Sequence, residues 1–210
     1  MQATSPRKPA PVPVKGNFRD KRYVVPNLLV DLQEERHQTT LWSPTQVILR
    51  DVDHPPAAGE VFTGILSFAK RPDATGLFQA RVARLDPARR LVGAAFEWIN
   101  EPGRALIADM LAQRKPDAPD DTPVMTVSIA HQTINWSLTG MLVARYRGDL
   151  ASGQPFRGLI RLEKAQEPGP FYASVIRADA QRETLAVKFQ DLPPKTFALL
   201  ETAIKKSNAN

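Results

Sequence analysis

Apolar and polar residues alternate along most of the chain, in short runs that end at glycines, prolines or polar turns. A period of two is typical of strands with one buried face. In the second half of the chain, the apolar runs predict strands at residues 125–129, 141–147, 155–163, 171–178 and 185–189. In the first half, they predict strands at residues 27–32, 46–52, 61–68, 78–85 and 91–98.

Each half ends in a stretch where apolar residues recur at helical spacing. One helix is expected to begin near Pro102 and the other near Pro193, with Asp191 as its cap. Strands joined by hairpins, with no helix between them, favour antiparallel sheets over a parallel one. We therefore predict a mainly β chain with two small antiparallel β-barrels, each followed by a C-terminal α-helix.

The two halves of the chain are copies of one another. The segment HQTTLWSPTQ at residues 37–46 returns as HQTINWSLTG at residues 131–140, with six identical positions. The register continues downstream and slips by one residue between residues 64 and 76, where a hairpin loop can absorb the difference. The period of 94 residues is too long for a solenoid repeat, which usually takes about 20 to 50 residues. Two similar small domains are therefore expected.

Two differences within the repeat change its chemistry. Asn135 in the second copy faces Leu41 in the first, and Gly140 faces Gln46. Only the second copy has an amide and a bare backbone at these positions. We infer that the two copies have diverged in function.

The chain divides into four segments. Residues 1–16 form a proline-rich tail that we expect to be disordered, because it has little apolar bulk to bury. Residues 17–114 and 124–210 are the two copies, and residues 115–123 are a polar, proline-rich linker between them.

Composition excludes several classes of protein. The chain has no cysteine, which excludes disulfides, thiolate nucleophiles and the common structural zinc sites. The formal charge is +6, and the tail supplies half of it. Elsewhere basic residues are mixed with acids, so no nucleic-acid polymer is expected as a partner. Without a long apolar run or a secretion signal, we expect a cytoplasmic protein with no membrane insertion.

Asn135, Ser137 and Gly140 fall at the predicted end of a strand and in its turn. An amide offers one acceptor and two donors, a hydroxyl adds a rotatable donor, and a glycine lets a planar ligand approach the backbone. These residues could instead only shape the turn, with Gly140 supplying a positive φ. On the residues alone, both interpretations stay open.

The motif Asn-x-Ser-x-x-Gly, followed by the apolar strand MLVARY, resembles that of the PilZ domain, a bacterial receptor for cyclic di-GMP. The first copy resembles a degenerate member of the family, because its motif position reads LWSPTQ. The resemblance covers roughly residues 17–206, and the specific motif occurs once. In that family an arm with the pattern Arg-x-x-x-Arg precedes the barrel, and its guanidinium groups bind phosphates and guanine.

Neither arm of this chain has the complete family pattern. The second copy has Arg114 and Lys115, but Ala118 stands where the second arginine belongs. The first copy has Arg19 and Arg22, one residue closer together than the pattern requires. The resemblance implies a cyclic di-GMP site in the second copy, with either arm supplying the cations. The implied ligand-binding residues are Arg114, Lys115, Asn135, Ser137, Gly140, Arg19 and Arg22.

The resemblance implies a non-catalytic receptor or adaptor that relays the second-messenger signal to a bacterial effector protein in motility, secretion or exopolysaccharide synthesis. Ligand binding would fold the arm around Arg114 onto the second barrel and change the angle between the barrels. The alternative is a tandem PilZ-like scaffold that binds no ligand and acts only through protein–protein contacts. The sequence leaves open whether the chain forms a homodimer.

Other chemistry has weaker support in the sequence. His37 and His131 repeat in register, but we can place no further ligands beside them, so no metal and no cofactor is expected. Ser67 and Lys70 have the Ser-x-x-Lys spacing of some acyl-transfer enzymes, yet they fall on a predicted strand without a companion Lys-Thr-Gly. We therefore predict no enzymatic activity. The repeated tryptophans are expected to anchor cores or domain contacts, although Trp136, inside the motif, could instead stack on a ligand.

Overall fold

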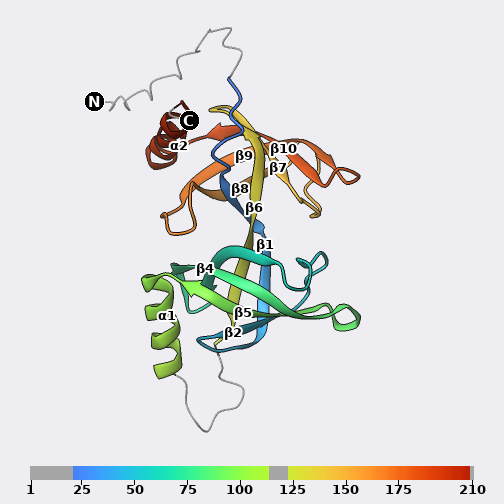
Figure 1. Ribbon diagram of the computed structural model, residues 1–210, viewed down its shortest axis with the longest axis vertical. Helices are drawn as coiled ribbons and strands as arrows, with labels where there is room; N and C mark the ends of the chain where they lie inside the picture. The colour runs from blue at the N-terminus through green and yellow to red at the C-terminus, as the bar shows by residue number, and fades with distance from the viewer. Residues whose placement is uncertain (1–20, 114–122, 209–210) are drawn as a thin grey trace, which may run out of the picture.

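The computed structural model describes residues 21–113 and 123–208 (Figure 1). The tail at residues 1–16 and residues 115–122 of the linker lie outside these ranges. In the first half the elements are β1 Leu29–Trp42, β2 Gln46–Leu49, β3 Val61–Phe68, β4 Arg71–Asp86, a 3₁₀ turn Pro87–Arg89, β5 Leu91–Ile99 and α1 Glu101–Ala112. In the second half they are β6 Met125–Trp136, β7 Gly140–Ala144, β8 Pro155–Arg161, β9 Gly169–Asp179, β10 Thr184–Asp191 and α2 Pro194–Asn208.

The strands form a closed antiparallel barrel in the order β1–β2–β5–β4–β3–β6–β7–β10–β9–β8. An additional pairing between β1 and β6 divides this ring in two. We call the part with β2, β3, β4 and β5 the first lobe, and the part with β7, β8, β9 and β10 the second lobe. Figure 1 shows α1 beside the first lobe and α2 beside the second. The prediction of a mainly β chain with an antiparallel barrel and a closing helix is confirmed.

Each lobe has its own apolar core, and the two cores match. Three phenylalanine rings pack edge to face in each core, at equivalent positions of the repeat. They are Phe62, Phe78 and Phe96 in the first lobe, and Phe156, Phe171 and Phe189 in the second. The downstream register of the repeat therefore reflects two equivalent sets of core side chains.

The helices begin close to where the sequence predicts. Asn100 caps α1, because its side chain accepts a hydrogen bond from Gly103 N at 2.9 Å. α2 begins at Pro194, but Asp191 is the last residue of β10, three positions before the first residue of the helix, so it does not have the cap position that we expected.

The two copies exchange their first half-strands. Leu28, Val30 and Leu32 precede the repeated segment of the first copy, yet they are fully buried in the core of the second lobe. Met125 and Val127 precede the repeated segment of the second copy and are fully buried in the core of the first lobe. β1 and β6 therefore each run through both lobes. The cores do not follow the division at residues 115–123 that we drew from the sequence.

Threonines of the repeated segment hold the exchanged half-strands in the same way in both lobes. Thr133 Oγ1 accepts a hydrogen bond from Leu28 N at 2.9 Å, and the equivalent Thr39 Oγ1 accepts one from Met125 N at 3.2 Å. All four residues are buried. Each bond pairs a backbone donor that would otherwise be buried without a partner.

The repeated tryptophans make a second matched pair of contacts. Trp136 Nε1 donates to the Pro26 carbonyl at 3.0 Å, and Trp42 Nε1 donates to the Pro123 carbonyl at 2.7 Å. Each indole thus binds the chain that leads into the other copy's half-strand. The repetition of His-Gln-Thr-x-x-Trp follows in part from this shared role, because its threonine and its tryptophan both hold the exchanged strand.

A buried ion pair lies where β1 crosses between the lobes. Asp31 pairs through its backbone with Ala130 of β6 and Leu159 of β8. Its side chain and that of Arg161 are both 0% exposed, with Asp31 Oδ2 and Arg161 Nε 3.8 Å apart. Ser128 Oγ donates to Asp31 Oδ1 at 3.3 Å. The crossing of the two shared strands is therefore built around a buried charge.

Candidate functional site

The Asn-x-Ser-x-x-Gly motif lies at a strand end and its turn, as the sequence predicts. β6 ends at Trp136, and β7 begins at Gly140. Ser137 is buried, and its Oγ accepts a hydrogen bond from Thr139 N at 3.2 Å. The same Oγ donates to the Gly140 carbonyl at 3.4 Å. Ser137 therefore closes the turn.

The first copy builds the same turn without the rest of the motif. Ser43 Oγ accepts hydrogen bonds from Thr45 N at 3.2 Å and from Gln46 N at 3.0 Å. Because the turn persists where the asparagine and the glycine are absent, the serine has a structural role in both copies. Ser137 alone does not indicate a ligand.

Gly140 is needed for close approach of two strands and not for a turn. A Cβ at this position would lie 2.2 Å from the carbonyl oxygen of Val187 on β10. Among the described glycines, the two with a positive φ are Gly59 and Gly153, so the interpretation of Gly140 as a positive-φ residue is wrong. The bare backbone at Gly140 pairs with Lys188, whose side chain is exposed.

Asn135 is the motif residue with unused hydrogen-bonding capacity. It is the residue before Trp136 on β6 and is partly exposed. Its side-chain amide has no hydrogen-bond partner among residues 21–113 and 123–208. The equivalent residue of the first copy, Leu41, is 64% exposed. The two lobes therefore present an amide and an apolar side chain, respectively, at the same surface position.

The chain before β1 reaches the motif of the second lobe. Tyr23 forms an isolated antiparallel bridge with Trp136, with N···O distances of 2.7 and 2.9 Å. The two rings are stacked, with centroids 4.8 Å apart. Arg22, the preceding residue, is exposed. The structure thus brings one of the predicted arginines next to the predicted motif.

The other predicted cations are not described. Arg19, Arg114 and Lys115 lie outside the described residues. Gln113, which precedes Arg114, caps α1 of the first lobe through a bond from its N–H to the Asp109 carbonyl at 3.1 Å. At the other end of the linker, Pro123 is bonded to Trp42 of the same lobe.

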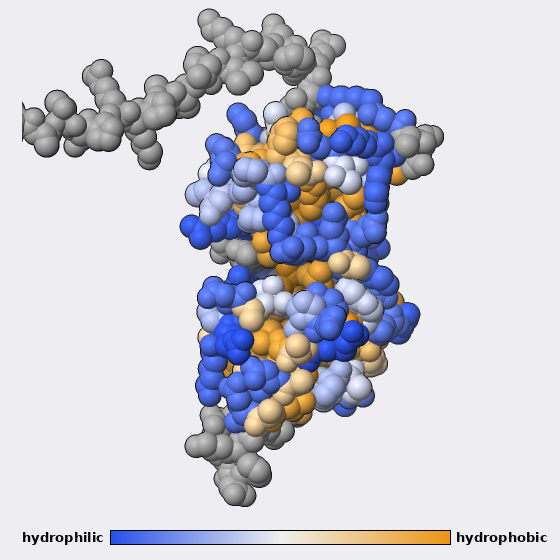
Figure 2. All heavy atoms as spheres, turned by 90° about the vertical axis from the view of Figure 1, so that its left-hand side faces the viewer, coloured by the Kyte–Doolittle hydropathy of each residue, from blue (hydrophilic) through white to orange (hydrophobic). Residues whose placement is uncertain are grey.

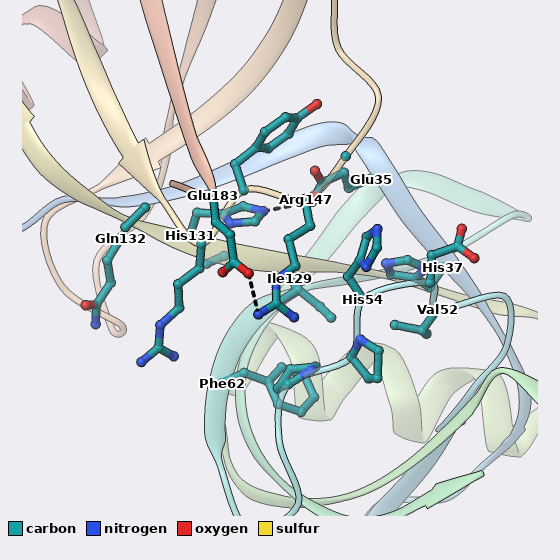
Figure 3. A pocket seen from close by; sticks show the side chains of 18 of the residues that line it. Glu35, His37, Val52, His54, Phe62, Ile129, His131, Gln132, Arg147 and Glu183 are labelled. Atoms are coloured by element: carbon teal, nitrogen blue, oxygen red, sulfur yellow. Dashed lines mark hydrogen bonds and ion pairs between the residues drawn. The ribbon is translucent and has the colours of Figure 1, made fainter. Parts of the chain in front are cut away.

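A cavity of about 990 Å³ lies between the lobes and is lined in part by His37, His54 and His131 (Figure 3). His131 Nε2 is 2.7 Å from Glu35 Oε2, and burial lowers the pKa of His37. Within the described ranges, no group of three or more histidine, aspartate or glutamate residues could hold a metal ion. Figure 2 shows that the molecule narrows at this junction and that apolar atoms reach its surface there.

Trp136 anchors the core of the second lobe, as expected from the sequence, but the sequence did not indicate a role for Tyr23. Trp136 is 1% exposed and belongs to the core of the second lobe, so its ring is not free to stack on a ligand. Tyr23 lies about 110 residues before the motif in the chain, and no spacing rule links the two. The repetition of Trp42 and Trp136 could have indicated that both indoles make an equivalent contact with the chain before the other copy's strand.

Comparison with known proteins finds a family match in the second half of the chain. Residues 119–206 match the PilZ domain. No helix among the described residues is long and apolar enough to span a membrane. No curated protein matches the chain.

Two solved structures resemble the chain. The Bacillus subtilis inhibitor of motility, MotI/DgrA, is 17% identical, over 88% of this chain and 97% of that one, with a TM-score of 0.33. YcgR from Escherichia coli in complex with c-di-GMP is 13% identical, over 87% of both chains, with a TM-score of 0.27. The match to the PilZ domain at residues 119–206 includes the whole Asn-x-Ser-x-x-Gly motif.

Proposed function

We propose that the chain is a non-catalytic receptor for cyclic di-GMP, with its ligand site on the second lobe. The family match at residues 119–206 supports this proposal, because it includes the motif on which the resemblance rests. We further propose that the first lobe is a second, degenerate barrel of the same type. It keeps the serine turn of the repeat but has Leu41 and Gln46 in place of the asparagine and the glycine.

The observation that carries the proposal is the side-chain amide of Asn135, which has no hydrogen-bond partner among the described residues. An asparagine that only shaped the turn would bond to the turn's backbone, as Ser137 does. The free amide instead offers one acceptor and two donors at the surface. These groups complement the polar edge of a guanine ring, which presents both acceptors and donors.

Gly140 contributes by letting β7 approach the Val187 carbonyl of β10, which a side chain would prevent. It pairs through its backbone with Lys188, whose exposed ammonium group could lie near a phosphate. Ser137 contributes indirectly, because its hydroxyl fixes the turn between the two. Asn135 is thus the residue proposed to contact the base, and Ser137 is a positioning residue.

The proposed role of ligand binding is to relay a signal to a protein partner in motility, secretion or exopolysaccharide synthesis. β1 and β6 are shared by the lobes, so a contact made at one end of these strands acts on elements common to both cores. For a relay, cyclic di-GMP must bind two arrangements of the molecule with different affinity. A cytoplasmic location and the absence of enzymatic activity are part of the same proposal.

Isothermal titration calorimetry with cyclic di-GMP tests this function on the full chain. We expect saturable binding, weakened about tenfold or more in Asn135→Ala, because the variant loses hydrogen bonds to the base. Leu41→Ala, at the matched position of the first lobe, is the control and should bind within about twofold of the wild-type chain.

The absence of heat with the wild-type chain, with its circular dichroism spectrum intact, would contradict the receptor. That result would favour the ligand-free scaffold, in which the exposed Leu41 of the first lobe contributes to a protein contact.

A further inference from the structure

We infer that the cations of the proposed ligand site come from the segment before β1, with Arg22 and Lys21, and not from the segment before β6. One site is then built from both copies of the repeat. This inference rests on the proposed function, and it names which part of the chain completes that site.

The segment before β1 is anchored to the motif of the second lobe. Tyr23 is bonded to Trp136 by two backbone hydrogen bonds, and its ring stacks on the indole. Three residues later, the Pro26 carbonyl accepts the indole N–H. The anchored residue of the motif is the one between Asn135 and Ser137, so the segment is fixed at the centre of the proposed site.

The side chains of Arg22 and Asn135 point away from the core. In an antiparallel pair, the residues next to a bridge point to the face opposite the bridged side chains. Tyr23 and Trp136 form the bridge and pack in the core of the second lobe. In this register Arg22 is opposite Ser137 and Val24 is opposite Asn135, so Arg22 is a diagonal neighbour of Asn135 on the outer face. Both are exposed or partly exposed. The guanidinium of Arg22 and the free amide of Asn135 therefore share one surface.

The guanidinium of Arg22 is available to bind a phosphate. Within the described residues its guanidinium has no ion-pair or hydrogen-bond partner. Lys21 is partly engaged, because its Nζ bonds to Asn208 Oδ1 at 3.2 Å and lies 5.3 Å from the centre of the Tyr23 ring. A free guanidinium presents a planar fork of donors that matches the oxygens of a phosphate.

The segments before β1 and before β6 differ in charge. Residues 15–22 contain four cations and one acid, whereas residues 114–122 contain two cations and three acids. The cations of the first set are Lys15, Arg19, Lys21 and Arg22, and the acids of the second are Asp117, Asp120 and Asp121. A ligand with two phosphates is attracted by the first segment and repelled on balance by the second.

The linker between the two copies is attached to the first lobe at both ends. Both of its described ends, Gln113 and Pro123, are bonded within the first lobe. Met125 is bonded to Thr39 of the first-copy repeat, and Trp136 lies in the motif of the second copy. The 12 residues of β6 between these two ends span roughly 36 Å at a rise of about 3.3 Å per residue. The exchange of half-strands thus associates the linker with Leu41 of the first lobe, and the segment before β1 with Asn135 of the second.

Calorimetry with cyclic di-GMP on full-length variants tests this assignment. We expect Arg22→Ala to weaken binding about tenfold or more, through loss of a charge-assisted contact. The double variant Arg114→Ala/Lys115→Ala is the matched control and should bind within about twofold of the wild-type chain.

Tyr23 provides a second measurement, because its proposed role is to position Arg22. Tyr23→Ala should weaken binding by about tenfold, whereas Tyr23→Phe, which keeps the stacked ring, should restore it to within about twofold. A general loss of folding would be visible as loss of the circular dichroism spectrum in both variants.

The possible results separate the two proposals. Binding that is weakened in the linker variant, with or without an effect of Arg22→Ala, would overturn the assignment and leave the receptor in place. Absence of binding by the wild-type chain would overturn the receptor and this inference together.

Discussion

Asp31 and Arg161 are charged residues in an interior that offers them few partners. Burial raises the pKa of Asp31 to about 6, and the nearby Arg161 guanidinium opposes that rise. Burial also lowers the pKa of Arg161. Arg161 Nη1 donates to the Lys164 carbonyl at 3.1 Å, but its Nε and Nη2 have no hydrogen-bond partner among the described residues. The stability of the structure where β1 crosses between the lobes therefore depends on the charges of both residues.

We predict that Arg161→Met destabilises the protein by about 3–5 kcal/mol at pH 7.5, because an unpaired carboxylate is left buried. The pKa of Asp31 in the folded state lies above its ordinary value of 3.8, so stability falls as pH rises between the two values. Without Arg161 this window extends to higher pH. The loss should therefore be smaller at pH 5 than at pH 7.5.

Urea unfolding of the variant at both pH values measures this effect. The double variant Asp31→Asn/Arg161→Met, which has no buried charge at the site, should recover most of the stability and lose the extra pH dependence. Equal destabilisation by Arg161→Met at pH 5 and pH 7.5 would show that Asp31 does not carry a buried charge.

Gly140 gives a second prediction at the scale of one residue. A Cβ there would overlap the Val187 carbonyl, so Gly140→Ala should cost roughly 1–3 kcal/mol. Gly93→Ala is the control, because the nearest atoms to its Cβ lie at 3.7 Å, an ordinary contact distance. Denaturant midpoints of the two variants provide the comparison, and an unchanged midpoint for Gly140→Ala would refute the close approach.

At the scale of elements, the exchanged half-strands depend on two equivalent threonines. Thr133→Val leaves the buried N–H of Leu28 without a partner, and Thr39→Val does the same to Met125. Each variant should lose about 1–3 kcal/mol. Thr40→Val changes an exposed neighbour and should be nearly neutral, within about 0.5 kcal/mol. Equal midpoints for all three variants would contradict the exchange.

Most elements could be predicted from the alternation of apolar residues, but their partners could not. β3 has the predicted bounds, and β1 and β6 each extend well beyond the predicted runs. The alternation of Leu28, Val30 and Leu32 predicts a strand with one buried face, but it does not indicate which sheet that strand joins. The pairing of β1 with β8 and the contacts with Thr133 and Trp136 show which core receives these side chains.

The motif residues of the candidate site could be predicted from the sequence, but the segment that lies beside them could not. Asn135 and its turn lie where the motif places them. The sequence also showed that the better arm and the complete motif belong to different copies. It could not show that Tyr23 is paired with Trp136, because that contact joins residues more than a hundred positions apart.

At the scale of the molecule, the exchange makes each core depend on both halves of the chain. A fragment of residues 124–210 lacks Leu28, Val30 and Leu32 of its core. We predict that it does not unfold cooperatively, whereas the same fragment joined to residues 21–32 by a flexible linker does. Thermal unfolding followed by circular dichroism distinguishes the two. A cooperative transition in the shorter fragment would mean that the second lobe is complete without the first copy.

A crystal structure of the chain with cyclic di-GMP tests the central claim most directly. The account predicts a nucleotide on the outer face of the second lobe, with Asn135 at a guanine edge and Arg22 at a phosphate. A nucleotide held by Arg114 and Lys115, or bound beside Leu41 on the first lobe, would contradict it.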